Sequence, residues 1–276
     1  MHTILEKKQF SADVFYFRVH APEIAKNRKA GQFVLIQLDV DFGERIPLTI
    51  ADADAQEGWI ALVVQAVGAT TIKLSRKNTG DSIAAILGPL GNPTHIENKG
   101  KVVCVGGGIG VAPLHPIAQA YKRAGNTVVI IIGGRTKQLV IFEQEMQKIA
   151  DELIIVTDDG SYGKKGLVTE PLKALCESAA PPQEVVAIGP PIMMKFCAET
   201  TRPYGVHTVV SLNTIMIDGT GMCGSCRVTV DGQTKFVCVD GPEFDGHKVD
   251  FDTMMLRMKA FKTREEHDKH RCQLNQ

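Results

Sequence analysis

The stretch Val105-Gly-Gly-Gly-Ile-Gly-Val-Ala-Pro113 follows a short apolar run, 102–105, and opens a segment with helical spacing, 111–123. Glycines at such a turn let the backbone approach a ligand closely, and the start of a helix offers unpaired N–H groups to an anion. Glycines of this kind can also serve close packing alone, but the flanking strand and helix favour a nucleotide. We therefore expect a dinucleotide pyrophosphate at Gly106, Gly107, Gly108 and Gly110.

Apolar strand-sized runs and helical stretches alternate on both sides of this turn. The predicted strands are 102–105, 128–132, 153–156, 184–188 and 207–212, and the predicted helices are 111–123, 140–150, 167–178 and 191–200. Alternation of this kind, with continuous apolar strands, indicates a parallel sheet covered by helices on both faces. We expect this α/β nucleotide-binding domain to span residues 98–212.

The region before it, residues 1–97, reads as β structure. Short runs rich in branched and aromatic residues are separated by Gly, Pro and Asp, and they predict strands at 14–19, 32–38, 48–50 and 59–65. One helical pattern, 70–76, interrupts them, and Gly88-Pro-Leu-Gly91 is expected to close the region with turns. Many short strands at this spacing favour a small antiparallel barrel.

Three of the seven cysteines, Cys223, Cys226 and Cys238, lie within sixteen residues of the third region. Two of them form C-x-x-C on a Gly-rich loop. After the loop, Asp231-Gly232 between the strand-like runs 227–230 and 234–237 predicts a hairpin. We expect a small metal-binding domain at 213–249. The scattered Cys104, Cys176, Cys197 and Cys272 are expected to be packing or surface residues.

Three chemistries fit this cysteine pattern. A zinc site would use the three cysteines and His247, and a redox dithiol would use Cys223 and Cys226 alone. A plant-type [2Fe–2S] cluster has the spacing C-x4-C-x2-C…C, and this template places its first ligand on Asp218. We predict a [2Fe–2S] cluster held by three thiolates and the Asp218 carboxylate; the alternative role for Asp218 is an ordinary turn acid.

The last region, 250–276, begins with a helical pattern. Its apolar face comprises Phe251, Met254, Met255, Met258 and Phe261. A stripe at this spacing predicts a helix packed on its own chain. Because Met-rich faces also suit partner surfaces, this helix or the cluster domain is expected to contact a partner.

Composition excludes several classes of protein. The chain has 276 residues, with 31 Lys+Arg and 31 Asp+Glu, so it is not a generally basic nucleic-acid binder. No apolar run is long enough to span a membrane, and the N-terminus has no signal core. An odd cysteine count argues against a disulfide framework, and we expect a cytoplasmic location.

The spacing G-G-G-x-G-x-A-P resembles the pyridine-nucleotide domain of the ferredoxin–NADP reductase superfamily. Four further segments match the superfamily in the same order along the chain: Arg45-Ile-Pro-Leu-Thr49, Gln65-Ala-Val-Gly-Ala-Thr-Thr71, Gly88-Pro-Leu-Gly91 and Ile188-Gly-Pro-Pro-Ile-Met193. The last departs from the family pattern because Ile188 replaces the usual Cys, which weakens any claim for a thiol acting at this point.

The resemblance implies an FAD-binding barrel followed by an NAD(H)-binding domain. Arg45 can neutralise the flavin pyrophosphate; its alternative role is a solvated surface residue. Thr49 can hydrogen-bond to the flavin ring; its alternative is a threonine on an exposed strand face. The implied FAD site comprises Arg45, Pro47, Leu48, Thr49, Gln65, Gly68, Thr70 and Thr71. The implied NAD(H) site adds Arg135, Asp158, Gly189 and Pro190 to the four glycines, with Asp159 and Tyr162 nearby; no side chain is assigned as a general acid or base.

Over the whole chain, the match is to small subunits of NADH-dependent reduced ferredoxin:NADP+ oxidoreductases, also described as sulfide dehydrogenase subunits. That resemblance implies FAD, NAD(H) and [2Fe–2S] in a heterodimer with a large flavin and iron–sulfur subunit. Ferredoxin would react through that subunit, possible electron bifurcation would belong to the complex, and neither nucleic acid nor a membrane span is involved. The alternatives are the electron-transfer subunit of dihydroorotate dehydrogenase and a non-catalytic nucleotide-binding protein with a structural zinc module.

Overall fold

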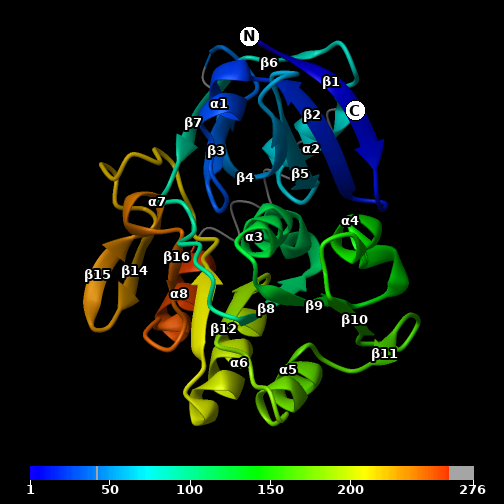
Figure 1. The fold of residues 1–276 in the computed structure, drawn as a ribbon. Helices are drawn as coiled ribbons and strands as arrows, with labels where there is room; N and C mark the ends of the chain where they lie inside the picture. The colour runs from blue at the N-terminus through cyan, green and yellow to red at the C-terminus, as the bar shows by residue number, and fades with distance from the viewer. Residues whose placement is uncertain (42, 261–276) are drawn as a thin grey trace.

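The computed structural model describes residues 1–41 and 43–260 and contains an antiparallel sheet at the N-terminus (Figure 1). Its strand order is β6-β1-β2-β5-β4-β3-β7. β6 and β7 lie at opposite edges of this sheet, yet only Ala84 separates them in the chain, so the sheet must curl until its edges meet. This confirms the predicted barrel. The strands are β1 (His2–Gln9), β2 (Val14–His20), β3 (Phe33–Gln37), β4 (Arg45–Asp54), β5 (Trp59–Gln65), β6 (Ser82–Ile83) and β7 (Ala85–Leu90).

Several barrel elements differ from the sequence prediction. β1 was not predicted because His2–Gln9 is mostly polar, and the short helix α1 (Pro22–Asn27) has too few residues for a periodic signal. β7 includes Gly88 and Pro89, which were expected in a turn; proline is tolerated there because β7 is an edge strand. The helix predicted at 70–76 is α2 (Ala69–Arg76).

A second, mostly parallel sheet follows, with strand order β11-β10-β9-β8-β12-β13-β16. Its central strands β8, β9 and β12 are almost wholly buried, and β10 and β13 partly so, as the sequence predicts for a sheet covered on both faces. The strands are β8 (Lys101–Gly107), β9 (Thr127–Gly134), β10 (Glu152–Thr157), β11 (Lys164–Lys165), β12 (Glu184–Ile188), β13 (His207–Ser211) and β16 (Glu243–Asp245).

Helices cover both faces of this sheet. α3 (Val111–Arg123) and α4 (Glu143–Gln147) pack in one hydrophobic cluster, and α5 (Thr169–Cys176) and α6 (Pro191–Thr201) contribute to another. α4 is shorter than the predicted 140–150, because Phe142 adopts a left-handed conformation with φ 59° and the helix begins only after it. Single 3-10 turns occur at Gly108–Gly110, Lys137–Leu139 and Arg202–Tyr204.

α3 lies between the parallel sheet and the barrel (Figure 1). Its buried side chains share a hydrophobic cluster with Tyr16, Trp59 and Val63 of the barrel. His115, 4% exposed, also places its Nδ1 atom 3.2 Å from the carbonyl oxygen of Ala51 in β4. The helix that begins at the Gly-rich turn is therefore fixed against both domains.

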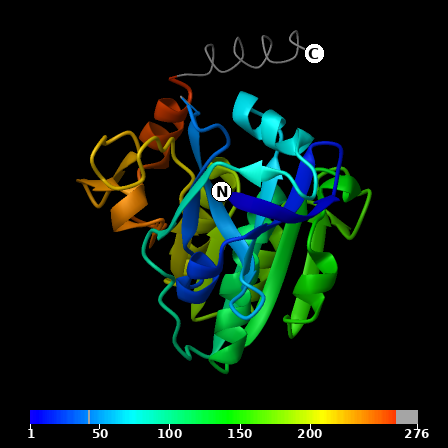
Figure 2. The ribbon, with the colours of Figure 1, turned by 90° about the horizontal axis from the view of Figure 1, so that it is seen from above.

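The C-terminal part contains the predicted hairpin, β14 (Arg227–Val230) and β15 (Gln233–Phe236). Its two turn residues, Asp231 and Gly232, have φ values of 52° and 72°, as a tight hairpin requires. α7 (Val237–Asp240) and α8 (Phe251–Met258) follow. The hairpin lies on the opposite side of the molecule from α4 (Figures 1 and 2).

β16 lies inside the predicted cluster domain, yet it pairs antiparallel with β13 in the nucleotide-domain sheet. The boundaries 1–97, 98–212, 213–249 and 250–276 stay predictions. On α8, Phe251 and Met254 are buried, and Met255 and Met258 pack against the same core. Phe261 and Cys272 lie outside the described residues. No helix in the described ranges is long and apolar enough to cross a membrane.

Candidate nucleotide, flavin and iron–sulfur sites

The Gly-rich turn is built for close approach of backbone to backbone and of backbone to ligand. A side chain at Gly110 would collide with the carbonyl oxygen of Ile188, and one at Gly107 with the sulfur of Met193. Gly108 differs, because it has φ 54° and a Cβ there would meet nothing within 4 Å. Gly106 and Gly110 thus allow α3 to pack against β8 and β12, and Gly107 leaves room for Met193 of α6. Gly108 leaves open space at the helix start, where a pyrophosphate fits.

The topology places this turn where ligands bind in open α/β sheets. β9 and β10 lie on one side of β8, and β12 and β13 on the other, so the strand order reverses between β8 and β12. The carboxyl ends of these two strands carry the Gly-rich turn and Gly189-Pro190. A ligand is expected in the crevice outside such a switch point. The structure therefore brings together two segments that the sequence places eighty residues apart.

Arg135 and Asp158 follow β9 and β10 at the same edge of the sheet. The loops are joined, because the N–H groups of Asp158 and Asp159 donate to the carbonyl oxygens of Gly134 and Arg135 at 3.0 and 3.2 Å. Both Arg135 and Asp158 are exposed. Their side chains are thus available to a bound nucleotide, and their roles stay predictions.

In the barrel, Arg45, Pro47, Leu48 and Thr49 all lie on β4. Arg45 is exposed, and its Nε atom donates to Gln37 Oε1 at 3.3 Å. Gln65 ends β5 and donates to Asp13 Oδ2 at 2.8 Å, so its side-chain amide already has a protein partner. Among the described residues no carboxylate lies within salt-bridge distance of Arg45, so its charge is available to an anion, as the FAD assignment requires.

The second flavin segment begins α2, and the structure connects it to the first. Gly68 is the N-cap of α2, and its N–H group donates to Thr71 Oγ1 at 2.9 Å. The Thr70 hydroxyl donates to the carboxylate of Glu44, the residue before Arg45. Sequence reasoning missed this role of Glu44, since only the fold brings its carboxylate to α2.

The structure brings two of the predicted cluster ligands together. The sulfur atoms of Cys226 and Cys238 are 3.3 Å apart, and both residues are buried. Burial raises the pKa of the Cys238 thiol to about 12. Cys223 is exposed on the same loop, and the hydroxyl of Ser225 holds its pKa below the ordinary value. Thiolates are the ligands that iron–sulfur clusters need, so this donor set fits such a group.

Asp218 organises the loop before these cysteines. Its Oδ2 atom accepts N–H donors from Thr220 and Met222, both at 3.1 Å, and the Thr220 hydroxyl donates to Oδ1. These bonds, the Thr220 hydroxyl first, hold the pKa of Asp218 below its usual range. Within residues 1–41 and 43–260, no three His, Cys, Asp or Glu side chains converge tightly enough to hold a metal ion. Cys223 and Asp218 therefore stay predicted ligands.

His247, the fourth ligand of the zinc alternative, is engaged elsewhere. Its Nε2 atom lies 3.0 Å from Thr201 Oγ1 at the end of α6, and burial lowers its pKa. The His247 side chain is thus bonded to α6, and the described residues do not bring it together with the cysteines into one metal-binding group.

The cluster loop packs directly on the flavin barrel. A Cβ on Gly219, next to Asp218, would lie 2.6 Å from Leu35 Cδ1 of β3, so the two are in close contact. Leu35 pairs with Pro47 of β4 in the strand register. Adjacent strands are about 4.8 Å apart, which places the cluster loop one strand away from the flavin segment.

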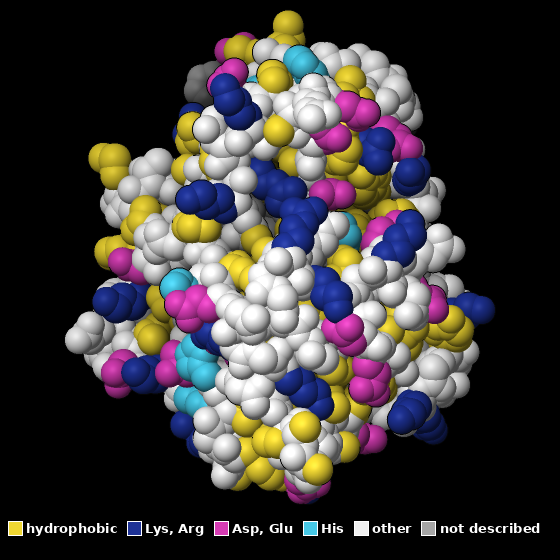
Figure 3. All heavy atoms as spheres, viewed as in Figure 1, with side chains coloured by type: hydrophobic (Ala, Val, Ile, Leu, Met, Phe, Trp, Pro, Cys, Tyr) yellow, Lys and Arg dark blue, Asp and Glu magenta, His cyan; other side chains and the backbone are white. Residues whose placement is uncertain are grey.

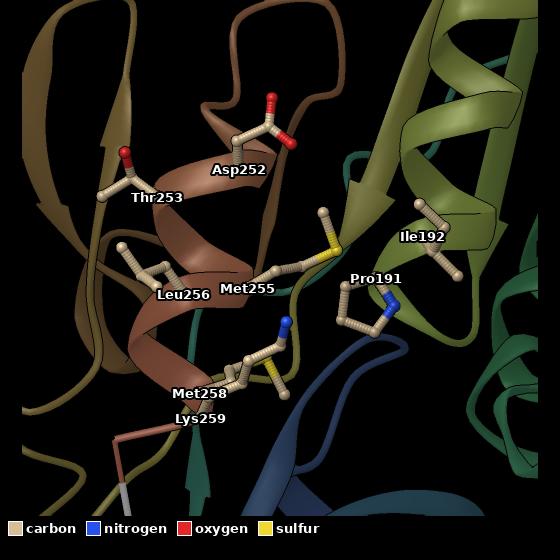
Figure 4. Close-up of a pocket in the computed structure, with 8 residues that line it drawn as sticks. All are labelled: Pro191, Ile192, Asp252, Thr253, Met255, Leu256, Met258 and Lys259. Carbon is tan, nitrogen blue, oxygen red and sulfur yellow. The ribbon is translucent and has the colours of Figure 1, made fainter.

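A large cavity of about 930 Å³ lies between the start of α6 and α8 (Figure 4). Pro191 and Ile192 form one wall, and Met255 and Met258 of α8 point toward them. Leu256, on the same helix, is 70% exposed. The cavity thus lies between the residues that follow Gly189-Pro190 and the C-terminal helix.

A flavin-type barrel, a nucleotide turn at the switch point of a parallel sheet and a cysteine loop packed on that barrel define an electron-transfer oxidoreductase subunit. Two family models agree. The NAD-binding domain of oxidoreductases matches residues 104–199, and the iron–sulfur cluster binding domain of dihydroorotate dehydrogenase B matches residues 213–250.

The chain belongs to the family of dihydroorotate dehydrogenase B electron-transfer subunits and their homologues. A homolog of that subunit from Thermotoga maritima is 49% identical over 96% of this chain and 93% of its own. The electron-transfer subunit of Geobacillus thermodenitrificans is 32% identical over 90% and 96%. A chain in a structure of NADH-dependent reduced ferredoxin–NADP oxidoreductase superposes with a TM-score of 0.93, at 48% identity over 98% and 97% of the two chains.

These matches confirm the predicted fold, an oxidoreductase subunit, and domains for NAD and for an iron–sulfur cluster. The structure of the similar oxidoreductase concerns flavin-based electron bifurcation, in line with the FAD expected here. The relatives are electron-transfer subunits of larger complexes, which supports a heterodimer with a larger subunit. The cytoplasmic location and the individual site residues stay predictions.

Proposed function

We propose that this chain passes electrons between NAD(H) and a larger partner subunit through FAD and a [2Fe–2S] cluster, as in ferredoxin:NADP+ oxidoreductases. The observation that carries the proposal is the contact of Gly219 with Leu35, because Leu35 pairs with Pro47 in the flavin strand. The loop that bears the cluster ligands thereby lies beside the flavin segment. When bound, FAD supplies the exchange between the two-electron chemistry of nicotinamide and the one-electron chemistry of a cluster.

The residues of this chain bind and orient the three groups. Gly108 and the start of α3 hold the NAD(H) pyrophosphate, and Gly189 and Pro190 border the nicotinamide at the switch point. Arg45 would neutralise the FAD pyrophosphate, and the Pro47–Thr49 segment would hold the flavin. No side chain of the chain is assigned a proton-transfer step.

Cys223, Cys226, Cys238 and Asp218 hold the cluster in this proposal. The supporting features are the paired sulfur atoms of Cys226 and Cys238 and the N–H groups that already converge on Asp218. The cysteine loop also carries Met222, 89% exposed, and Ile217, 57% exposed. Exposed apolar side chains at a redox centre suit a partner surface, and we assign this loop, together with α8, to the contact with the large subunit. Ferredoxin reacts through that subunit.

Substitution of Asp218 tests the ligand set. Asp218→Ala should lose cluster iron and change the EPR spectrum of the reduced protein, and Asp218→Cys should retain the cluster with an altered spectrum, since sulfur is a softer donor than oxygen. Asp252→Ala is the control, because Asp252 is an exposed acid of the same C-terminal region whose carboxylate pairs with Lys195 at 2.8 Å. An alanine variant with full iron content and the wild-type spectrum would exclude Asp218 as a ligand.

The choice of nicotinamide is tested by steady-state dye reduction. We expect NADH to give the higher kcat/KM, although Arg135 suits the extra phosphate of NADPH, because the family match is to NAD(+)-dependent enzymes. A preference for NADPH would refute this assignment. The same purified protein should be yellow-brown with flavin and iron absorbance; a colourless protein with bound zinc would refute the proposed function as a whole.

A second function is favoured by one observation. The family model for residues 213–250 is that of dihydroorotate dehydrogenase B, so the large partner could oxidise dihydroorotate. Dihydroorotate-dependent reduction of NAD+ by the purified complex would support this alternative, and ferredoxin-dependent reduction would support the first.

A further inference from the structure

A cavity of about 630 Å³ lies at the junction of the barrel and the nucleotide domain, apart from all the sites described above. Four segments form its walls: the end of α1 with the chain after it, the end of β4, the linker between the two domains, and α3 from Pro116 onward. Its polar lining residues are Arg28, Lys29, Thr94, His95, Gln119 and Arg123. With a rise of 1.5 Å per residue, Gln119 is about 12 Å along α3 from Val111, so the cavity does not belong to the Gly-rich turn. Its volume is typical of small-ligand sites, which span about 300–1,000 Å³.

The cavity carries more positive than negative charge. Arg28 lies 3.6 Å from Asp52, and His95 lies 2.8 Å from Glu97, so both have carboxylate partners. Across residues 1–41 and 43–260, no carboxylate lies within salt-bridge distance of Lys29 or Arg123. Lys and Arg side chains gather along the same junction on the surface between the barrel and α3 (Figure 3).

The two arginines both line the cavity, and their charges act on each other. The Arg28 side chain is only 16% exposed, and its burial lowers its pKa; Asp52 opposes this shift, and the positive charge of Arg123 adds to it. Like charges that share a partly dry site repel each other, because the local dielectric is lower than that of water. An anion between them removes the repulsion and replaces the water that burial takes from Arg28.

We propose that this cavity binds a phosphate group, either free or carried by a phosphate monoester. Guanidinium groups match phosphate oxygens in a bidentate fork, and Arg28 and Arg123 approach the cavity from different domains. The apolar wall formed by Ala30, Ile96 and Pro116 accommodates the organic part of an ester. The site goes beyond the proposed electron transfer. It ties the barrel to the nucleotide domain, because Arg28 belongs to the first and Arg123 to the second.

The test is isothermal titration calorimetry of the FAD- and cluster-loaded protein in a phosphate-free buffer of low ionic strength. The NAD(H) site is first saturated with NAD+, so that it cannot take the probes. The probes are inorganic phosphate, ribose 5-phosphate and AMP. The variants are Arg123→Gln and Arg28→Gln, with Lys122→Gln as the matched control, since Lys122 is the neighbour of Arg123, carries the same charge and pairs with Asp151 at 2.6 Å outside the cavity.

We expect saturable binding to the wild type and to Lys122→Gln, and about tenfold weaker binding to Arg123→Gln, which corresponds to about 1.4 kcal/mol. Arg123 is exposed, so its variant should fold, and an unchanged flavin spectrum checks this. Tighter binding of the esters identifies an organic phosphate as the ligand, and equal binding identifies free phosphate. The proposal is overturned if no probe binds the wild type, if Arg123→Gln binds like the wild type, or if Lys122→Gln loses as much affinity.

Discussion

Replacing Glu184 should cost the protein a measurable part of its stability. Glu184 starts β12 and is 1% exposed. Its carboxylate accepts hydrogen bonds from the ammonium of Lys99 and the hydroxyl of Tyr121, and it lies 2.8 Å from His207 Nδ1. It therefore connects the linker, α3 and β13 at the edge of the sheet opposite the nucleotide.

The structure sets the size of the effect. Glu184→Gln keeps the shape and can still accept from Tyr121, but its bonds are no longer charge-assisted, which should cost about 2 kcal/mol of unfolding free energy. Lys99 and His207 are 25% and 51% exposed, so water can solvate them in the variant. Glu184→Ala also leaves the buried Tyr121 hydroxyl with a weaker contact, 3.3 Å from the carbonyl oxygen of His95, and should cost roughly 3–4 kcal/mol.

The assay is urea unfolding of the cofactor-loaded protein, followed by far-UV circular dichroism. Burial raises the pKa of Glu184, but its bonds to Lys99, Tyr121 and His207 outweigh burial, and the net shift is downward. A lowered pKa stabilises the fold above the unfolded value of about 4.3, and this stability is lost as the pH falls through the lower folded value. Glu152→Gln, an exposed change at the start of β10, should lie within about 0.5 kcal/mol of wild type. Equal losses in Glu184→Gln and Glu152→Gln would refute the reasoning.

Two further predictions concern the cofactors. Gly108→Ala and Gly205→Ala should impose the same backbone strain, about 1–2 kcal/mol each, since both glycines have positive φ and open space around them. Only Gly108→Ala should weaken NADH binding, by about tenfold in a fluorescence titration. Equal Kd values in the two variants would contradict the nucleotide assignment. Arg45→Gln should lower the affinity for FAD by about tenfold, measured from flavin absorbance after dialysis, and Arg76→Gln, at the far end of α2, should not; loss of FAD in both would show a general charge effect.

Local patterns predicted the nucleotide domain well. The helix at 111–123 and the strand at 184–188 have the predicted bounds, because a Gly-rich turn starts the first and the apolar run 185–188 makes up most of the second. β1 was missed because its residues alternate little between apolar and polar, and pairing with β2 and β6 determines its conformation. Propensity is overridden there by tertiary contacts.

Candidate site residues were predictable where a motif carries them and not where the fold assembles them. The four glycines lie close to one another in the sequence, and so do the three cysteines, so the spacing within each group reveals it. Glu44 at α2 and Leu35 beneath Gly219 depend on contacts between residues 26 and 184 positions apart, and no local pattern announces such contacts. The same is true of Glu184, whose partners come from three other segments.

The cluster unit is part of the framework that positions the two other domains. Asn92 in the linker donates its N–H group to the Gly241 carbonyl oxygen at 2.7 Å and its side-chain amide to Val239 at 3.1 Å. The Thr94 hydroxyl donates to Glu243 at 2.6 Å, and burial raises the pKa of Glu243 to about 7. The segment after Cys238 therefore holds the only covalent connection between barrel and nucleotide domain. β16 then joins the nucleotide-domain sheet. The same contacts therefore determine two distances: the one from the cluster loop to the flavin strand, and the one from the flavin strand to the nucleotide turn.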